Sequence, residues 1–106
     1  MATREDAPTR EKINRETARI SWQELQPFFA QGLAVGVAEG MDLVEVAYQF
    51  AVDNGEQVKA WMESGQVAPV KDKQAAAWLE ADAGVWAVVV KPFVLVQPEK
   101  GWAVKA

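Results

Sequence analysis

Glu39, Asp42 and Glu45 are the first candidates for chemistry, because these three carboxylates fall within seven residues, shortly before Tyr48. Oxygen ligands grouped in this way can hold Mg²⁺ or Ca²⁺, and carboxylates can also transfer protons. The regular ligand order of a calcium loop is absent, however, and Asp42 with Glu45 has the spacing of a helix capping box. We therefore favour a capping role, with a small-molecule binder or a carboxylate-dependent enzyme as the alternative function.

The composition narrows the chemistry further. The chain contains no cysteine and no histidine. Disulfides, thiolate zinc sites and cysteine nucleophiles are therefore excluded, as are serine–histidine hydrolysis and metal sites with imidazole ligands. We assign no catalytic residue, metal or cofactor, and we favour a protein that is not an enzyme.

The charge distribution argues against nucleic-acid binding. The net charge is −4, and residues 39–63 contain six carboxylates against one lysine. A surface of this sign repels phosphate backbones. The stretch AWMESGQVAPVKDKQAAAWLE could place two helices around a short link, loosely like a helix-turn-helix, but its second helix is too acidic to contact DNA. We expect no nucleic-acid partner.

No segment has the length of a membrane span. The longest apolar run covers residues 85–90, far short of the ~20 residues that cross a bilayer. The N-terminus, MATREDAPTREK, is polar and lacks the apolar centre of a secretory signal. We expect a cytoplasmic protein with no membrane partner.

Caps and glycines divide the chain into elements. Thr9 can cap a first helix, Ser21 and Glu24 have capping-box spacing at a second, and Gly65 can end a later one. We expect a flexible tail over residues 1–8, one domain over residues 9–97 and a C-terminal tail over residues 98–106. Helical patterns cover residues 10–20, 22–31, 41–54, 55–64 and 72–83.

The fold class that these patterns predict is α+β. A short apolar strand covers residues 33–40, and residues 66–70 form a brief extended link. The C-terminal segment VWAVVVKPFVLVQ, residues 85–97, is mostly apolar without alternation, so both of its faces require cover. We expect a single small domain of about four helices, packed on a small, mainly antiparallel sheet with one long, bent C-terminal strand.

Pro92 limits where this long strand can lie in the sheet and indicates where it can bend. Proline cannot donate a ladder hydrogen bond, so the strand should lie at a sheet edge or bend at a bulge. A hairpin at Lys91-Pro92 is disfavoured, since no Gly, Asn or Asp follows. An exposed apolar edge favours pairing with a second copy, which predicts a homodimer. The alternative is an interior strand with Lys91-Pro92 at a harmless bend.

The favoured function is accordingly a non-catalytic, self-associating protein-interaction module that can also dock an unidentified protein. Its surface should include Trp22, Phe28, Phe29, Lys91, Pro92 and Phe93, for each of which core packing is the competing explanation. Among the other tryptophans, Trp61, Trp78 and Trp86 are expected in the core, and Trp102 at the surface or interface.

Four blocks of the chain resemble a small bacterial family known as domain of unknown function 2288. The blocks are EKINRETARISWQELQPFFAQG, EGMDLVEVAYQFAVDN, VKAWMESGQV and WAVVVKPFVLVQ, in this order and at this spacing. The likeness covers roughly residues 11–97 and leaves out the tail that carries Trp102. It implies a free-standing bacterial cytosolic protein, and it assigns no activity, cofactor or site residue to any position.

Overall fold

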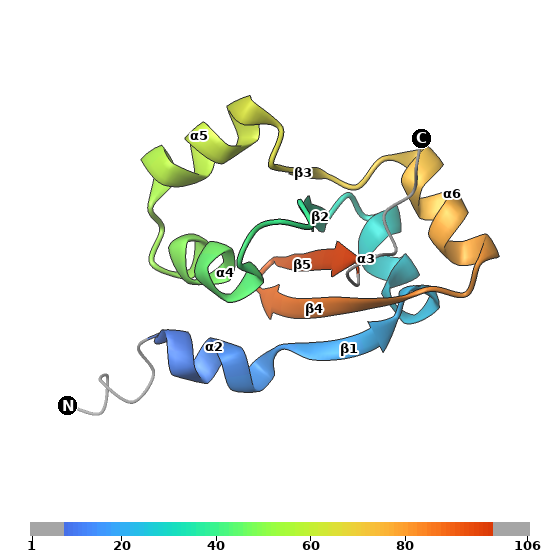
Figure 1. Ribbon diagram of the computed structural model, residues 1–106, viewed down its shortest axis with the longest axis horizontal. Helices are drawn as coiled ribbons and strands as arrows, with labels where there is room; N and C mark the ends of the chain where they lie inside the picture. Colours follow the sequence, from blue (N-terminus) through green and yellow to red (C-terminus); the bar gives the residue numbers. More distant parts are fainter. Residues whose placement is uncertain (1–7, 99–106) are drawn as a thin grey trace.

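The computed structural model describes residues 8–98, in which one sheet lies between two groups of helices (Figure 1). The helices are α2 (Arg10–Glu16), the 3-10 helix η1 (Trp22–Leu25), α3 (Gln26–Ala30), α4 (Leu43–Ala51), α5 (Gly55–Ser64) and α6 (Asp72–Glu80). The strands are β1 (Ala18–Ser21), β2 (Ala34–Val37), β3 (Val67–Pro69), β4 (Gly84–Val90) and β5 (Phe93–Pro98). The predicted α+β class is confirmed, with five α-helices in the described residues where about four were expected.

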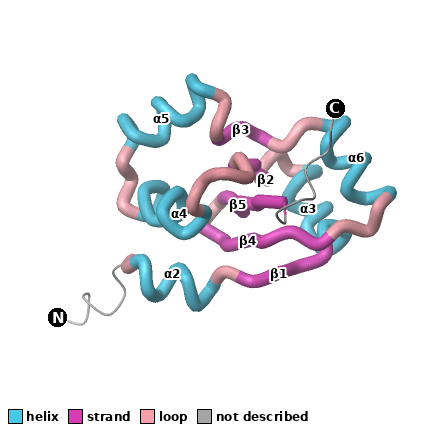
Figure 2. Tube along the Cα trace, in the orientation of Figure 1, coloured by secondary structure: helices cyan, strands magenta, loops and turns pink. Residues whose placement is uncertain are grey.

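The five strands form one mixed sheet in the order β1-β4-β5-β2-β3. Figure 2 shows the strands together in the middle of the molecule, with the helices around them. Only the β2–β5 pair is parallel among the described strands, so the prediction of a mainly antiparallel sheet is confirmed. The two edges belong to the short strands β1 and β3.

The long C-terminal strand of the prediction is instead a β-hairpin. Residues of β4 and β5 pair antiparallel from Val85 with Pro98 to Val90 with Phe93, and the Lys91–Pro92 peptide bond is cis. A cis-proline at the third position of a turn reverses the chain without a residue of positive φ. The prediction that disfavoured a hairpin at Lys91-Pro92 is therefore wrong.

The position of this hairpin overturns the predicted self-pairing edge. β4 lies between β1 and β5, and β5 lies between β4 and β2, so both strands are paired on each side. The alternative of an interior segment is therefore the correct one. Association between copies therefore cannot use backbone pairing along β4 or β5.

Helices cover both faces of the hairpin. One face carries cluster 1, in which Val85 and Val94 pack with Trp22 and Trp78 beneath η1, α3 and α6. The other face carries cluster 2, in which Val88 and Leu95 pack beneath α2, α4 and α5. The alternation of neighbouring residues on β5 places Leu95 on the side opposite Val94 and explains why the segment is apolar throughout.

The first helix is shorter than predicted. α2 begins after Thr9, whose Oγ1 accepts from Lys12 N at 3.0 Å, and ends at Glu16. The helical pattern continues to Ile20, but residues 18–21 form β1 because they pair with β4. Backbone pairing with an existing strand outweighs a weak local helix preference in a four-residue segment.

The predicted boundary at Ser21 is confirmed: η1 begins at Trp22, and Ser21 Oγ accepts from Gln23 N at 3.3 Å. The chain restarts as α3, with Pro27 in its first turn. At the far end of α5, Gly65 has a φ of 83°, the left-handed conformation that ends a helix at glycine. Within residues 8–98 no helix is long and apolar enough to cross a membrane.

Candidate functional site

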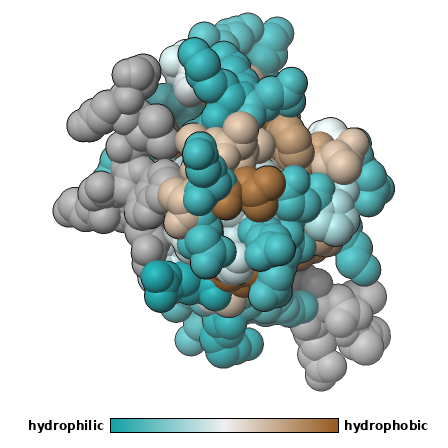
Figure 3. Space-filling view, turned by 90° about the vertical axis from the view of Figure 1, so that its right-hand side faces the viewer, coloured by the Kyte–Doolittle hydropathy of each residue, from teal (hydrophilic) through white to brown (hydrophobic). Residues whose placement is uncertain are grey.

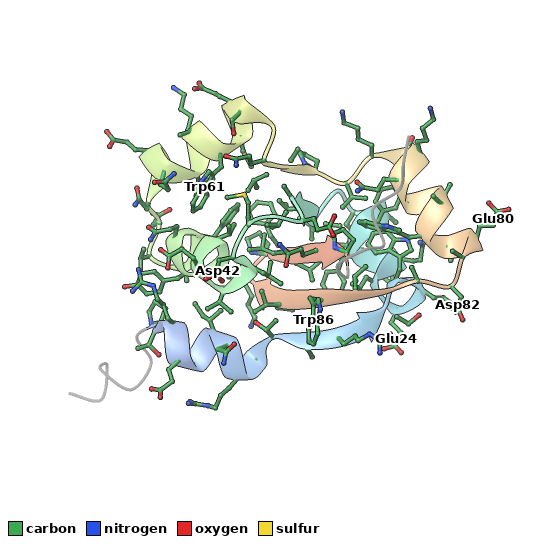
Figure 4. The ribbon with its side chains drawn as sticks, viewed as in Figure 1. Glu24, Asp42, Trp61, Glu80, Asp82 and Trp86 are labelled. Atoms are coloured by element: carbon green, nitrogen blue, oxygen red, sulfur yellow. The ribbon has the colours of Figure 1, made fainter. Side chains whose placement is uncertain are left out.

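The acidic cluster predicted from the sequence does not converge on one point. Asp42 precedes α4, where its Oδ1 accepts from the backbone N–H groups of Val44 at 3.0 Å and Glu45 at 3.2 Å (Figure 4). Glu39 lies elsewhere and lines a hollow beside β2 and β3. Among residues 8–98, no group of three or more acidic side chains is placed to hold a metal ion.

Glu45 is held by an ion pair that joins α2 to α4. Its carboxylate accepts from Arg10 Nε at 2.5 Å and Nη2 at 3.1 Å, and from Gln49 Nε2 at 2.7 Å. These hydrogen bonds, that of Arg10 foremost, lower the pKa of Glu45 to about 2. The Arg10 guanidinium also lies over the Tyr48 ring, 4.1 Å from its centroid. Glu45 and Tyr48 of α4 thus both contact Arg10 and connect α4 to α2.

Trp22 belongs to the core and is absent from the surface. Its exposed fraction is 0%. The ring meets Trp78 edge-on at a centroid distance of 5.0 Å and Phe29 at 5.8 Å. The prediction of a surface position is corrected: η1 turns Trp22 under α6, and the backbone N–H of Trp22 donates to Ala83 O at 2.9 Å. Its indole Nε1 has no hydrogen-bond partner in the described residues.

Phe28 and Phe29 border an apolar area at one end of the molecule. Both are half-buried and pack against cluster 1 from α3. Nearby α6 carries Leu79, which is 46% exposed. Figure 3 shows apolar side chains in the middle of this end, with hydrophilic ones above, below and to the right of them. The two phenylalanines are therefore partly core and partly surface.

Lys91, Pro92 and Phe93 lie at the tip of the β4–β5 hairpin and line a hollow of about 350 Å³. We call it the hairpin-tip hollow; its lining residues are Phe50, Asp53, Asn54, Gly55, Val58, Met62, Val90, Lys91, Pro92 and Phe93. Phe93 meets Phe50 edge-on at a centroid distance of 6.1 Å. The hollow is thus built where the α4–α5 turn meets the hairpin.

The predicted interaction residues therefore fall into two separate groups. Trp22 lies beside Ala83, immediately before β4 begins, whereas Lys91 follows directly after β4 ends. A strand of seven residues spans about 23 Å at ~3.3 Å per residue. Phe28 and Phe29 consequently lie near one end of the sheet and the hairpin tip near the other, so no single surface contains all six.

The remaining tryptophans divide between core and surface. Trp78 is 1% exposed, which confirms its predicted core position, whereas Trp61 is only half-buried and packs against cluster 2 from α5. The core position predicted for Trp86 is wrong: it is 41% exposed on β4, because α2 and α4 cover only part of that face (Figure 4). Trp102 lies outside the described residues.

The helix-turn-helix interpretation is wrong for this chain. α5 packs on the cluster 2 face and α6 on the cluster 1 face, so the sheet separates them. The expected link between them, residues 66–70, contains the edge strand β3. The two helices therefore form no compact pair that could enter a groove of DNA.

Sequence reasoning missed the residues that complete the hairpin-tip hollow. Val58 and Met62 lie one turn apart on α5, and Met62 is 42% exposed. Asp53 has a positive φ of 61° in the turn before α5. The four-residue spacing of Val58 and Met62 was a usable signal, but only the position of the hairpin tip shows what faces them.

The fold defines a class: a small three-layer α+β protein whose sheet is covered on both faces. The chain belongs to the family described as "Protein of unknown function (DUF2288)", whose model matches residues 8–98. It is also similar to protein PA1075 from Pseudomonas aeruginosa, whose structure was determined in solution by NMR. The two share 40% sequence identity and a TM-score of 0.78, over 100% of this chain and 94% of that chain. A comparison with curated proteins finds no match.

Proposed function

We propose that the protein is a non-catalytic interaction module that self-associates through the hairpin-tip hollow. The observation that carries the proposal is the hollow itself, which has a volume of about 350 Å³ and is lined mainly by apolar side chains from α4, α5 and the hairpin, with Asp53, Asn54 and Lys91 among them. Met62, which lines the hollow, is 42% exposed, and Val52, next to the lining residue Asp53, is 40% exposed. Apolar surface of this kind is stabilised by association, because burial removes it from water.

The charges at the hollow favour a second copy as the occupant. Asp53 and Lys91 both line it, one from the α4–α5 turn and one from the hairpin. A two-fold axis through such a surface can place Lys91 of one copy opposite Asp53 of the other, and symmetry then repeats the pair. An apolar centre flanked by one cation and one anion is therefore complementary to itself.

Sedimentation equilibrium over a concentration series tests this assignment. The wild-type protein should show a mass that rises from one chain towards two with concentration. Met62→Lys should keep the mass of one chain, since it places a charge in the apolar centre at a position exposed enough to tolerate lysine. Lys91→Glu should weaken association, because two carboxylates then face each other.

Leu79→Lys is the matched control, since Leu79 is 46% exposed on α6 and has no part in the hollow. It should associate as the wild type does. If Leu79→Lys abolishes association and Met62→Lys does not, the interface is the α3–α6 end and our assignment is wrong. A wild-type mass of one chain at every concentration would refute self-association.

A small-molecule ligand is the second candidate occupant. The volume of the hairpin-tip hollow falls within the ~300–1,000 Å³ typical of ligand sites. Catalysis by Asp42 and Glu45 receives less support, because a helix cap and an ion pair already occupy these carboxylates. A monomer that binds apolar ligands at Met62 would favour this second candidate.

A further inference from the structure

A second hollow opens on the cluster 2 face of the sheet, between α2, the strands β4 and β5, and the start of α4. Its volume is about 350 Å³. We call it the Trp86 hollow; its lining residues are Asn14, Thr17, Met41, Asp42, Leu43, Val44, Trp86 and Gln97. It shares no residue with the hairpin-tip hollow, so a ligand bound here leaves the proposed self-association surface free.

An exposed indole forms part of this hollow. Trp86 is 41% exposed, although Val88, two residues further on the same face of β4, is 2% exposed in cluster 2 (Figure 4). Trp86 pairs with Gln97 of β5, which places the two side chains next to each other on this face. The indole is therefore open to a ligand and has an amide beside it.

Three lining side chains offer an oxygen acceptor whose position is fixed by another hydrogen bond of the same group. Gln97 Nε2 donates to two backbone carbonyls at 2.7 and 2.8 Å, which leaves Oε1 free. Asp42 Oδ1 accepts both cap hydrogen bonds, which leaves Oδ2 free. Thr17 Oγ1 donates to a backbone carbonyl at 2.8 Å, so it can only accept from a ligand. Within residues 8–98, no donor bonds to these three acceptors.

Two donors accompany the three acceptors. The side-chain amide of Asn14 and the indole N–H of Trp86 make no hydrogen bond in the part of the chain that the structure describes. A hydroxyl group both donates and accepts, so a ligand with several hydroxyls matches this mixture. The C–H groups on one face of a sugar ring are apolar and can stack on the negative face of an indole. A sugar ring combines both properties.

The charge of the hollow favours a neutral ligand over a nucleotide. Asp42 is the only charged residue in the lining, and its carboxylate repels phosphate. Arg19, the other cross-strand neighbour of Trp86, does not line the hollow. Its Nε lies 3.3 Å from the position of a Cβ atom on Gly84, two residues before Trp86.

We propose that the Trp86 hollow binds one ring of a neutral carbohydrate, stacked on Trp86. Hydroxyls of the ring donate to the free oxygens of Thr17, Asp42 and Gln97. Because their own hydrogen bonds already hold these side chains, binding orders few additional groups. The volume of the hollow lies within the ~300–1,000 Å³ typical of small-molecule sites.

NMR titration of the ¹⁵N-labelled full chain tests the proposal, with the methyl glycosides of glucose, galactose, mannose and N-acetylglucosamine as probes. At least one probe should shift the indole signal of Trp86 and the side-chain amide signals of Asn14 and Gln97 to saturation, while the amide of Met62 stays unchanged. Uridine monophosphate should bind more weakly. The proposal is overturned if none of the four sugars gives a saturable shift at Trp86, or if the nucleotide binds as tightly as the best sugar.

Three substitutions locate the bound sugar. Trp86→Ala should weaken binding about tenfold, because the stacking surface is lost. Thr17→Val keeps the shape of the side chain, removes one acceptor and should weaken binding several-fold. Val89→Ala is the matched control, since Val89 is 50% exposed on the opposite face of β4 and should bind as the wild type does.

Two outcomes of these substitutions contradict the assignment. Unchanged binding in Trp86→Ala, or an equal loss in Val89→Ala, would show that the sugar lies elsewhere. A loss in Trp86→Ala with none in Thr17→Val would show that stacking alone holds the ligand, which overturns its recognition through hydroxyls.

Discussion

At the residue scale, two of the carboxylates that were candidates for catalysis or metal binding have structural roles: Asp42 caps α4, and Glu45 forms an ion pair with α2. Arg10 and Glu45 illustrate this, since their ion pair joins helices through residues that are 35 positions apart in sequence. The pair is largely exposed, and exposed pairs contribute little to stability. The role of the pair is to orient α2 against α4 at the edge of cluster 2.

The lowered pKa of Glu45 predicts how this contact responds to acid. A carboxyl whose folded pKa falls from 4.5 to about 2 favours the folded state above pH 4.5 and loses that contribution as pH falls through about 2. Titration of Glu45 followed by ¹³C NMR should give a midpoint near 2. In Arg10→Gln the midpoint should rise towards 4.5; an unchanged midpoint would show that Arg10 is not the cause.

Two tryptophans with opposite environments give a matched pair of substitutions. Trp22→Ala removes a side chain that is 0% exposed and should cost about 3–5 kcal/mol of unfolding free energy. Trp86→Ala removes one that is 41% exposed and should cost much less. Urea denaturation measures both. Equal losses would contradict the placement of Trp22 in the core and Trp86 at the surface.

At the element scale, local sequence signals set where helices begin, and pairing with neighbouring strands determines whether a segment becomes a helix or a strand. Ser21 and Asp42 both begin helices where their spacing predicted. Residues 18–21 show the opposite case, because the helical pattern gives way to β1 once β4 offers hydrogen-bonding partners. Caps depend on the nearest three residues, whereas a strand depends on a segment far away in sequence.

Asp42 permits a direct test of its cap. Asp42→Ala should cost about 1 kcal/mol of unfolding free energy, because the N–H groups of Val44 and Glu45 lose their acceptor. Asp42→Asn keeps an oxygen acceptor and should retain most of the stability. Thermal unfolding, with hydrogen exchange at the two amides, measures the effect. If the two variants are equally destabilised, the carboxylate charge matters and capping does not explain its role.

At the scale of the whole molecule, the hairpin is the element on which both core clusters depend. Its two strands lie in the middle of the sheet and contribute side chains to cluster 1 on one face and to cluster 2 on the other. We therefore expect a disturbance on either face to affect the whole fold through β4 and β5.

Leu95→Ala tests this dependence. Leu95 is 0% exposed in cluster 2, and its truncation should cost about 2–5 kcal/mol. The indole signals of Trp22 and Trp78, which lie in cluster 1, should disappear at the same lowered urea concentration as signals from cluster 2. If the cluster 1 signals keep their wild-type midpoint, the two faces unfold independently and the hairpin does not couple them.

The local features of this protein follow directly from its sequence. Caps at Thr9, Ser21 and Asp42, the helix end at Gly65 and the family blocks all depend on neighbouring residues, so they could be predicted. The α+β class followed from the same patterns. The absence of cysteine and histidine limits the possible chemistry whatever the fold, because it depends on residue types alone.

Only the tertiary structure determines which of these segments come into contact and which residues they bury. It splits residues 85–97 into a hairpin, buries Trp22, exposes Trp86, and brings Lys91 to the same hollow as Asp53 and Met62. Burial and strand pairing depend on contacts between segments far apart in the chain, and a residue's type reports only that it can be buried. The hairpin-tip hollow arises from such contacts, and for that reason the spacing of Val58 and Met62 alone could not show what faces them.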